Sequence, residues 1–408
     1  MVGRRYLAVV ALTAVTALLV AGCDGGEDGT TQSGGGDHVT VYSSLPLQAG
    51  TSRSQAAAIV AGIELALRER HGRAGDLRVE YRSLDDSTRE EGGPAPGSEA
   101  ANARNAVQDH TAVAYIGAMS FESTAISIPV LNEGGMVQVS PAATYDGLTK
   151  ETPAAQRGEP EKYYPTQERT FARIVPIDSL QARVLAGTMR AAGCRDAYIV
   201  QEGATASSAL GRALASDIGT RGMKLAGQAV VDTEDPDLDA LAGQARDSGA
   251  GCAVYTGDAS EATVQVYETI ADALPGTRLF GADGVCRAGF VNPADGLPEV
   301  VGDRLTCTSV TRDIDTYPGG ERIARRLPAG ARDAHALYGY EAMRLVLDAI
   351  AKGGADRHKV RETLMATRDR RSPLGTYSFD ENGDTTLAEY GVYRARGGRL
   401  RLQRVSRP

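Results

Sequence analysis

From residue 38 onward, apolar and polar positions follow two different periods along this chain. Val39–Tyr42 is a short apolar run typical of a strand, whereas Ile59, Ile63 and Leu67 recur at helical spacing and predict a helix over 55–70. Further strands are expected at 77–81, 113–117 and 137–139, and further helices at 99–110 and 123–132. Strands that alternate with helices in this order indicate a parallel sheet with helices on both faces.

The alternation stops between residues 151 and 169 and then begins again. Pro153, Pro160 and Pro165 predict a long loop in this stretch. A second doubly wound α/β lobe is predicted beyond it, because four more apolar runs are each preceded by a helical stretch. These expected strands are 197–200, 224–231, 253–256 and 278–281. A helix is expected over 334–351, and the region 375–403 is predicted to be rich in β-structure.

The segment Asp380–Asp384 allows two interpretations. The residues Glu381-Asn382-Gly383-Asp384 are typical of a tight turn, while the spacing of Asp380, Asn382 and Asp384 is that of a calcium loop. The calcium loop is rejected because its sixth position is Thr385 rather than Gly and its twelfth is Gly391 rather than Glu. A tight turn is therefore expected.

The N-terminal segment has the layout of an export signal. Arg4 and Arg5 precede an uncharged apolar run, Leu7–Ala21, and a polar stretch over 24–37 follows Cys23. The sequence Val20-Ala21-Gly22-Cys23 resembles the bacterial lipobox, in which the cysteine is acylated. Residues 1–22 are therefore expected to be a signal peptide and 23–37 a lipid-anchored flexible tether. A retained membrane helix is the alternative, but the apolar run is short for a bilayer; the residues around the arginine pair do not fit a twin-arginine signal.

Length and charge limit the possible functions. The 386 residues left after removal of the signal are enough for two domains, and 42 basic against 52 acidic residues give a net charge of −10. This acidic balance argues against a nucleic-acid partner. The absence of Trp disfavours an aromatic cage for carbohydrates or quaternary amines.

Four cysteines besides Cys23 are expected to form two disulfides. An even number of cysteines outside the cytoplasm favours disulfides over zinc, and no pair has C-x-x-C spacing. Cys194 and Cys252 each lie just before a predicted strand, the first and third of the second lobe, and these strands are commonly neighbours. We therefore predict a Cys194–Cys252 bond, which leaves Cys286 and Cys307 as the second pair.

Catalytic and metal-binding motifs are not recognisable in the sequence. The five histidines are scattered without metal-ligand spacing, and the chain contains no nucleophile elbow, Walker A loop or dinucleotide-binding glycine motif. A binding protein without metal or cofactor is therefore expected rather than an enzyme.

Polar residues lie just beyond two predicted strands of the first lobe. One segment, 117–124, leads from a strand into a helix, and another, 140–144, follows the next strand. In doubly wound sheets ligands bind outside the carboxyl ends of the strands, where helix N-termini offer free N–H groups. Ordinary helix capping by Ser and Thr is the alternative reading of both segments.

At these residues the chain resembles the leucine/isoleucine/valine-binding family, the type I solute-binding proteins of ABC importers. The markers extend over most of the chain: Pro46-Leu47, Gly62, Leu65-Ala66, Asp85-Asp86, Ile116-Gly117, Ser140–Thr144, Leu148-Thr149, Gly281–Gly284 and Tyr338–Ala342. The resemblance implies two Rossmann-like lobes that are joined by three hinge crossings. These crossings are expected near Ile174, Cys286 and Pro373, with one lobe at 38–173 plus 285–372 and the other at 174–284 plus 373–408.

The resemblance also implies a set of ligand contacts. In the family, loop backbone and a threonine hydroxyl bind an amino-acid carboxylate, and they match Ala142 and Thr144 here; the carboxylate that binds the ammonium matches Glu261. A carboxylate-binding serine is replaced by Phe121, with Ser120 beside it, and an aromatic residue is replaced by Leu210. Ala143 and Asp283 complete the expected set of ligand-binding residues.

The expected function is capture of a small amino-acid-like ligand and its delivery to ABC permease subunits. The protein is expected to be a monomer that is anchored by lipid on Cys23 at the extracytoplasmic face of the membrane. The apolar replacements Phe121 and Leu210 predict a ligand that is bulkier or less polar than that of a generalist amino-acid binder. A surface sensor of the same fold that acts on a signalling partner is the alternative, and Glu261 could instead pair with a neighbouring arginine.

Overall fold

The structure, a computed structural model, describes residues 37–50 and 52–408. The predicted signal peptide, the predicted lipidation site Cys23 and the predicted tether up to residue 36 lie outside the described residues. Among the helices of the described part, none is both long enough and apolar enough to cross a membrane.

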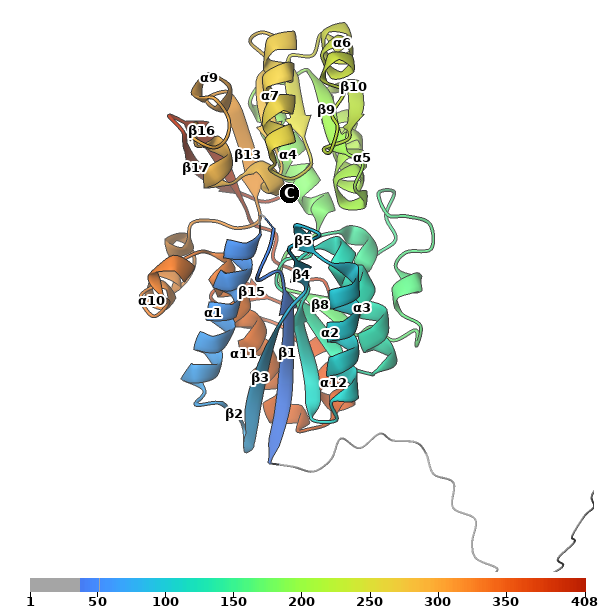
Figure 1. The fold of residues 1–408 in the computed structure, drawn as a ribbon, viewed down its shortest axis with the longest axis vertical. Coiled ribbons are helices and arrows are strands. Elements are labelled where there is room, and N and C mark those ends of the chain that lie inside the picture. Colours follow the sequence, from blue (N-terminus) through green and yellow to red (C-terminus); the bar gives the residue numbers. More distant parts are fainter. Residues whose placement is uncertain (1–36, 51) are drawn as a thin grey trace, which may run out of the picture. The chain divides into compact units, whose positions relative to one another are not determined.

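The first lobe is built on a six-stranded sheet. Its strand order is β2-β3-β1-β6-β7-β8, and β2 alone runs antiparallel to its neighbour (Figure 1). The strands are β1 (His38–Leu45), β2 (Arg73–Ala74), β3 (Leu77–Asp85), β6 (Ala112–Gly117), β7 (Val137–Ser140) and β8 (Phe171–Arg173), and a two-stranded hairpin comprises β4 (Ser87–Thr88) and β5 (Gly93–Pro94). In this order β1 lies between β3 and β6, which confirms the predicted doubly wound sheet.

Alternating side chains of the central strands serve the two faces of this sheet. Val39 and Val41 pack into the larger core with helices α1 and α11, while Tyr42 and Tyr115 face a smaller core with α2. The helices of this lobe are α1 (Arg53–Glu69), α2 (Pro96–Gln108), α3 (Phe121–Glu133), α10 (Gly320–Ala324), α11 (His335–Gly353) and α12 (Arg357–Met365).

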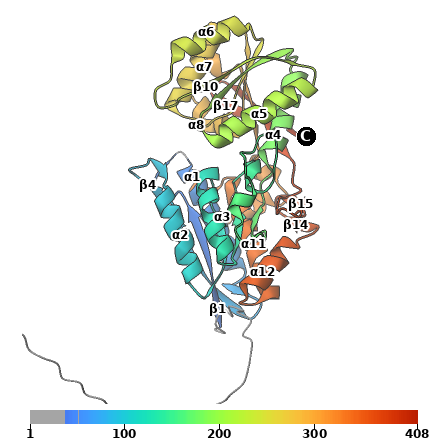
Figure 2. The same ribbon diagram turned by 90° about the vertical axis from the view of Figure 1, so that its right-hand side faces the viewer.

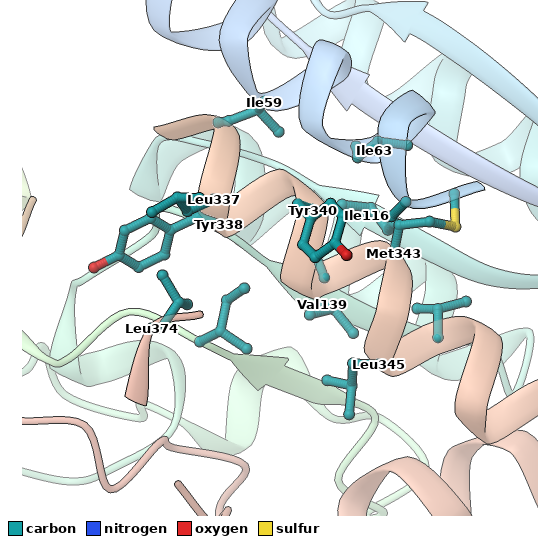
Figure 3. Close-up of a cluster of buried hydrophobic side chains, with 14 of the residues drawn as sticks. Ile59, Ile63, Ile116, Val139, Leu337, Tyr338, Tyr340, Met343, Leu345 and Leu374 are labelled. Carbon is teal, nitrogen blue, oxygen red and sulfur yellow. The ribbon is translucent and has the colours of Figure 1, made fainter. Parts of the chain in front are cut away.

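Helices α1 and α11 approach each other closely through two glycines. A Cβ atom on Gly62 would lie 2.0 Å from the carbonyl oxygen of Ala336, and one on Gly339 would lie 2.1 Å from that of Ile59. Figure 3 shows the apolar side chains around this contact, with Ile59 and Ile63 on α1 and Tyr340 on α11. The family marker Gly62 therefore has a packing role.

The second lobe contains a seven-stranded sheet of the same design. Its order is β10-β9-β11-β12-β13-β16-β17. The first five strands are parallel, β16 is antiparallel to β13, and β17 is antiparallel to β16. The strands are β9 (Asp196–Glu202), β10 (Lys224–Val231), β11 (Cys252–Tyr255), β12 (Arg278–Gly281), β13 (Leu305–Ser309), β16 (Tyr390–Arg396) and β17 (Arg399–Ser406). The helices are α4 (Asp178–Ala191), α5 (Thr205–Thr220), α6 (Leu238–Ser248), α7 (Glu261–Ala273), α8 (Ala288–Val291) and α9 (Glu299–Gly302). The predicted α/β fold of two doubly wound lobes is confirmed.

Two disulfides link neighbouring elements of the second lobe. Cys194 precedes β9 and is bonded to Cys252 at the start of β11, and these two strands are hydrogen-bonded neighbours. The second bond joins Cys286 to Cys307 on β13. Both pairs are those expected from the sequence.

Two of the three crossings between the lobes differ from the expected positions. Strand β13 pairs with β12, and Phe290 and Leu305 belong to the core of the second lobe, so the chain crosses after Ser309 and not near Cys286. Tyr377 and Phe379 still pack in the core of the first lobe, and the second sheet resumes only at β16. The hairpin of β14 (Arg370–Ser372) and β15 (Gly375–Tyr377) thus lies beside α11 and α12 (Figure 2).

Candidate functional site

The carboxyl ends of strands from both sheets border a cavity of about 250 Å³. In the first lobe the lining begins just after β1, β6 and β7, and in the second lobe just after β9, β11, β12 and β13. The lining includes Ser120, Phe121, Glu122, Ala142, Thr144, Tyr145, Asp178, Glu202, Leu210, Asp258, Asp283, Cys286, Arg287 and His335. The cavity therefore occupies the place where ligands bind in doubly wound folds.

The turn from β6 into α3 supplies one wall of the cavity. Ser120 is the N-cap of α3, and its hydroxyl oxygen accepts a hydrogen bond from the Ser123 N–H at 3.1 Å. Phe121 packs edge-on against Tyr145, with ring centroids 4.4 Å apart. Both residues that were expected to contact the ligand thus line the cavity. Ser120 also caps the helix, which was the alternative interpretation of this segment.

The loop after β7 differs in one respect from the carboxylate-binding loop that the resemblance implied. The hydroxyl oxygen of Ser140 accepts hydrogen bonds from the N–H groups of Ala142 and Ala143, at 3.2 and 2.9 Å. These two N–H groups are therefore already satisfied within the loop, and Ala143 is buried outside the lining. Thr144 lies in the lining, where its hydroxyl can reach a ligand.

Arg173 stabilises this loop through hydrogen bonds to its backbone. Its Nη1 donates hydrogen bonds to the carbonyl oxygens of Ala143 and Tyr145, at 3.0 and 2.8 Å, and its Nε donates to Asp384 Oδ1 at 2.7 Å. Burial raises the pKa of Asp384, but the charges of Arg173 and Lys150 outweigh it and keep this pKa below its ordinary value. The loop that carries Thr144 is thus fixed by a buried ion pair.

Glu202, at the end of β9, is one of the carboxylates that the second lobe brings to the cavity. Its Oε1 accepts hydrogen bonds from the Tyr255 hydroxyl at 2.7 Å and from the Asp258 N–H at 2.9 Å. A Cβ atom on Gly257 would lie only 2.2 Å from Oε1, so glycine makes room for this carboxylate. Burial raises the pKa of Glu202. For Oε2 we find no hydrogen-bond partner within residues 37–50 and 52–408, which leaves this oxygen free for a ligand.

Glu261, the carboxylate expected from the resemblance, lies elsewhere. It is the first residue of α7, it is exposed, and it does not line the cavity. The expected match depended on sequence order alone, whereas Ser260 begins the helix and Glu261 follows it at the surface. The predicted strand 197–200 ended too early to include Glu202, which the rule of strand carboxyl ends would otherwise have identified.

Two further carboxylates lie deeper in the lining. Asp178, at the start of α4, is 7% exposed; burial and the charges of Asp146 and Asp283 raise its pKa to about 8, while Thr144 and Arg173 lower it. The pKa of Asp283 is raised mainly by burial and next by Asp258. The expected contact Asp283 thus has Asp178 as a neighbour that sequence reasoning missed.

Arg287 is the guanidinium of the lining. Its Nη2 lies 3.4 Å from Asp258 Oδ1, and its Nε is buried without a hydrogen-bond partner among the described residues. Cys286, which is bonded to Cys307, lies next to it in the lining. His335 at the start of α11 contacts Asp333, with 2.5 Å between Nδ1 and Oδ1.

Comparisons with known proteins agree with this architecture. The periplasmic binding protein family matches residues 44–399, and the chain therefore belongs to this family of solute-binding proteins. A leucine-binding protein from Thermotoga maritima is similar in structure, with a TM-score of 0.72 and 20% identity over 91% of this chain and 99% of that chain. No curated protein sequence matches the chain.

Two further solved structures are similar. One is a branched-chain amino acid transporter substrate-binding protein from Streptococcus pneumoniae in complex with isoleucine, with a TM-score of 0.72 and 16% identity over 91% of this chain and all of that chain. The other is an ABC transporter solute-binding protein from R. palustris in complex with benzoate, with a TM-score of 0.69 and 17% identity over 91% of this chain and 97% of that chain. At these identities the comparison establishes the fold.

Proposed function

We propose that the protein captures a small amino-acid-like solute in the cavity between its two lobes and delivers it to an ABC importer. The observation that carries this proposal is the pairing of two chemistries in one cavity. The hydroxyls of Ser120 and Thr144 come from the first lobe, and the carboxylate of Glu202 comes from the second. Hydroxyl donors suit a ligand carboxylate, and a half-paired carboxylate suits a ligand ammonium group.

A ligand that contacts both lobes at once stabilises the arrangement in which both sets of groups reach it. Such differential affinity is the physical basis of ligand-dependent closure. Phe121 and Leu210 add apolar surface to the cavity, which supports a ligand with an apolar side chain or linker. The solved relatives hold isoleucine and benzoate, both carboxylates with an apolar body.

A matched pair of variants tests the role of Glu202. A thermal-shift screen against amino acids, small amides and aromatic carboxylates would first identify a ligand, since binding to the native state alone adds roughly 2.7 kcal/mol at a hundredfold excess over Kd. Glu202→Gln should then reduce the affinity by about 2–5 kcal/mol if the ligand ammonium is held in a buried ion pair. Glu261→Gln is the control, because this side chain is exposed outside the lining.

Two results would contradict the proposal. The first is tight amino-acid binding that is lost in Glu261→Gln and kept in Glu202→Gln, since the ammonium site would then lie at Glu261. The second is the absence of any amino-acid binding at millimolar concentration while an aromatic carboxylate binds, because the ammonium contact would then have no part in recognition.

We further propose that the protein is held at the extracytoplasmic face of the membrane by a lipid on Cys23. The sequence Val20-Ala21-Gly22-Cys23 supports this proposal. Cell fractionation and mass spectrometry of the mature N-terminus test it. Wild-type protein should be acylated and membrane-bound, whereas Cys23→Ser should be released or remain unprocessed; identical fractionation and mass would contradict the anchor.

A further inference from the structure

The cavity lining has an excess of acidic over basic side chains. Its ionisable side chains include five carboxylates and one guanidinium. The carboxylates belong to Glu122, Asp178, Glu202, Asp258 and Asp283. A zwitterionic amino acid with an uncharged side chain brings no net charge and would leave this excess uncompensated. Uncompensated carboxylates in a partly desolvated cavity are costly, so the lining favours a ligand with net positive charge.

The carboxylates reach the cavity from different elements. Glu202 is the last residue of β9 and Asp178 is the first residue of α4, while Asp258 and Asp283 follow β11 and β12. Glu202 and Asp178 therefore offer two carboxylates from different elements of one cavity, and the lining also includes the apolar side chains of Val175 and Leu210.

Asp178 has no cationic partner among the described residues. Asp178 is buried, and none of the described Lys, Arg or His side chains forms an ion pair with it. Arg287, the guanidinium of the lining, pairs with Asp258. Arg173, which lies outside the lining, pairs with Asp384. A buried carboxylate that faces a cavity without a cationic partner is a site at which a ligand can supply the missing charge.

We propose that the ligand carries two cationic nitrogen groups on an aliphatic chain, one bound at Glu202 and the other at Asp178. A basic amino acid and a linear diamine share this chemistry. This inference rests on the proposed capture of a small solute in the same cavity and names the class of that solute. The hydroxyls of Ser120 and Thr144 would be needed only by the amino acid, which has a carboxylate.

Calorimetric titration of the purified protein with lysine, norleucine and cadaverine tests the inference. Norleucine is close to lysine in length but lacks the side-chain ammonium, and cadaverine has two ammonium groups and no carboxylate. Wild-type protein should bind lysine or cadaverine about 30-fold or more tightly than norleucine. In Asp178→Asn this preference should largely disappear. Glu261→Gln, outside the cavity, should retain the full preference.

The outcomes separate this inference from the proposed function. Lysine binding that exceeds cadaverine binding supports a basic amino acid, and the reverse order supports a diamine and removes the need for an amino-acid carboxylate. Equal affinities for lysine and norleucine would overturn the second cation and leave the amino-acid proposal intact. Absence of binding by all three at millimolar concentration would overturn the inference, and the wider thermal-shift screen would then decide the proposed function. A thermal unfolding curve for Asp178→Asn shows that the variant is folded.

Discussion

Arg173 and Asp384 form an ion pair that is almost completely buried, although 211 positions separate them in the sequence. Arg173 lies on the last strand of the first sheet, and Asp384 lies in the turn that precedes the return to the second sheet. The pair also has backbone support, because the Arg173 N–H donates to the carbonyl oxygen of Gly383 at 3.0 Å. A crossing between the lobes is thereby joined to the loop that carries Thr144.

Replacement of Arg173 by Met should therefore destabilise the protein by about 3–5 kcal/mol, since it leaves a buried carboxylate without its main partner. Urea unfolding at neutral pH measures the change. Arg325→Met is a suitable control, because Arg325 forms an exposed ion pair with Glu321 and such pairs contribute little. Equal changes in the two variants would contradict the structural role of Arg173.

The sequence pattern identified most strands, but it missed elements whose signals are polar. Strand β9 was expected to end at Val200, because Gln201 and Glu202 are polar, yet both residues continue the strand. Strand β13 was not expected at all, since Thr306 and Thr308 interrupt its short apolar pattern. Pairing with the neighbouring strands stabilises these polar segments, and such long-range pairing cannot be read from local periodicity.

These two missed segments explain two differences between the expected and the observed structure. The early end of β9 hid Glu202, and the missing β13 placed a crossing near Cys286 instead of after Ser309. By contrast, Ser120, Phe121 and Thr144 follow strands that the sequence pattern identified, and all three line the cavity. The disulfide pairing was also correct, since it depends only on which strands are neighbours.

Gly257→Ala should weaken ligand binding through Glu202. The new methyl group would lie where the Glu202 carboxylate lies, and the side chain would have to give up its bonds to Tyr255 and to the Asp258 N–H. We expect a loss of about 1–2 kcal/mol of stability and at least about a tenfold loss of affinity for an ammonium ligand. Gly243→Ala in α6 is the control, since nothing lies within 4 Å of its new Cβ atom. Unchanged affinity in Gly257→Ala would contradict the role of Glu202.

The two disulfides should differ in their effect on binding. Removal of either bond by paired Cys→Ser substitution should cost about 2–4 kcal/mol of stability. Among the four disulfide-bonded cysteines, only Cys286 lies in the cavity lining, whereas Cys194 and Cys252 belong to a buried core of the second lobe. Loss of the Cys286–Cys307 bond should therefore also reduce ligand affinity, and loss of the other bond should not. Calorimetry of both double variants tests this difference, and equal affinities would argue against it.

Asp178→Asn should stabilise the protein without ligand, and the gain should depend on pH. Burial and the charges of Asp146 and Asp283 raise the pKa of Asp178 from 3.8 to about 8, although Arg173 partly opposes this shift. The pKa of this carboxyl group is higher in the folded state than in the unfolded state, so the protonated form favours folding and the ionised form opposes it. Wild-type stability is therefore lost relative to the variant as the pH rises from about 4 to about 8.

The expected difference in unfolding free energy is small at pH 4, exceeds about 1 kcal/mol by pH 7 and levels off above pH 8. Differential scanning calorimetry at several pH values measures it. Asp146 and Asp283 titrate in both proteins, so the difference isolates Asp178 and its repulsion by these two neighbours. A cation bound at Asp178 should remove the wild-type disadvantage, because it favours the ionised carboxylate. A difference that does not change with pH would show that Asp178 is not the group whose ionisation is costly.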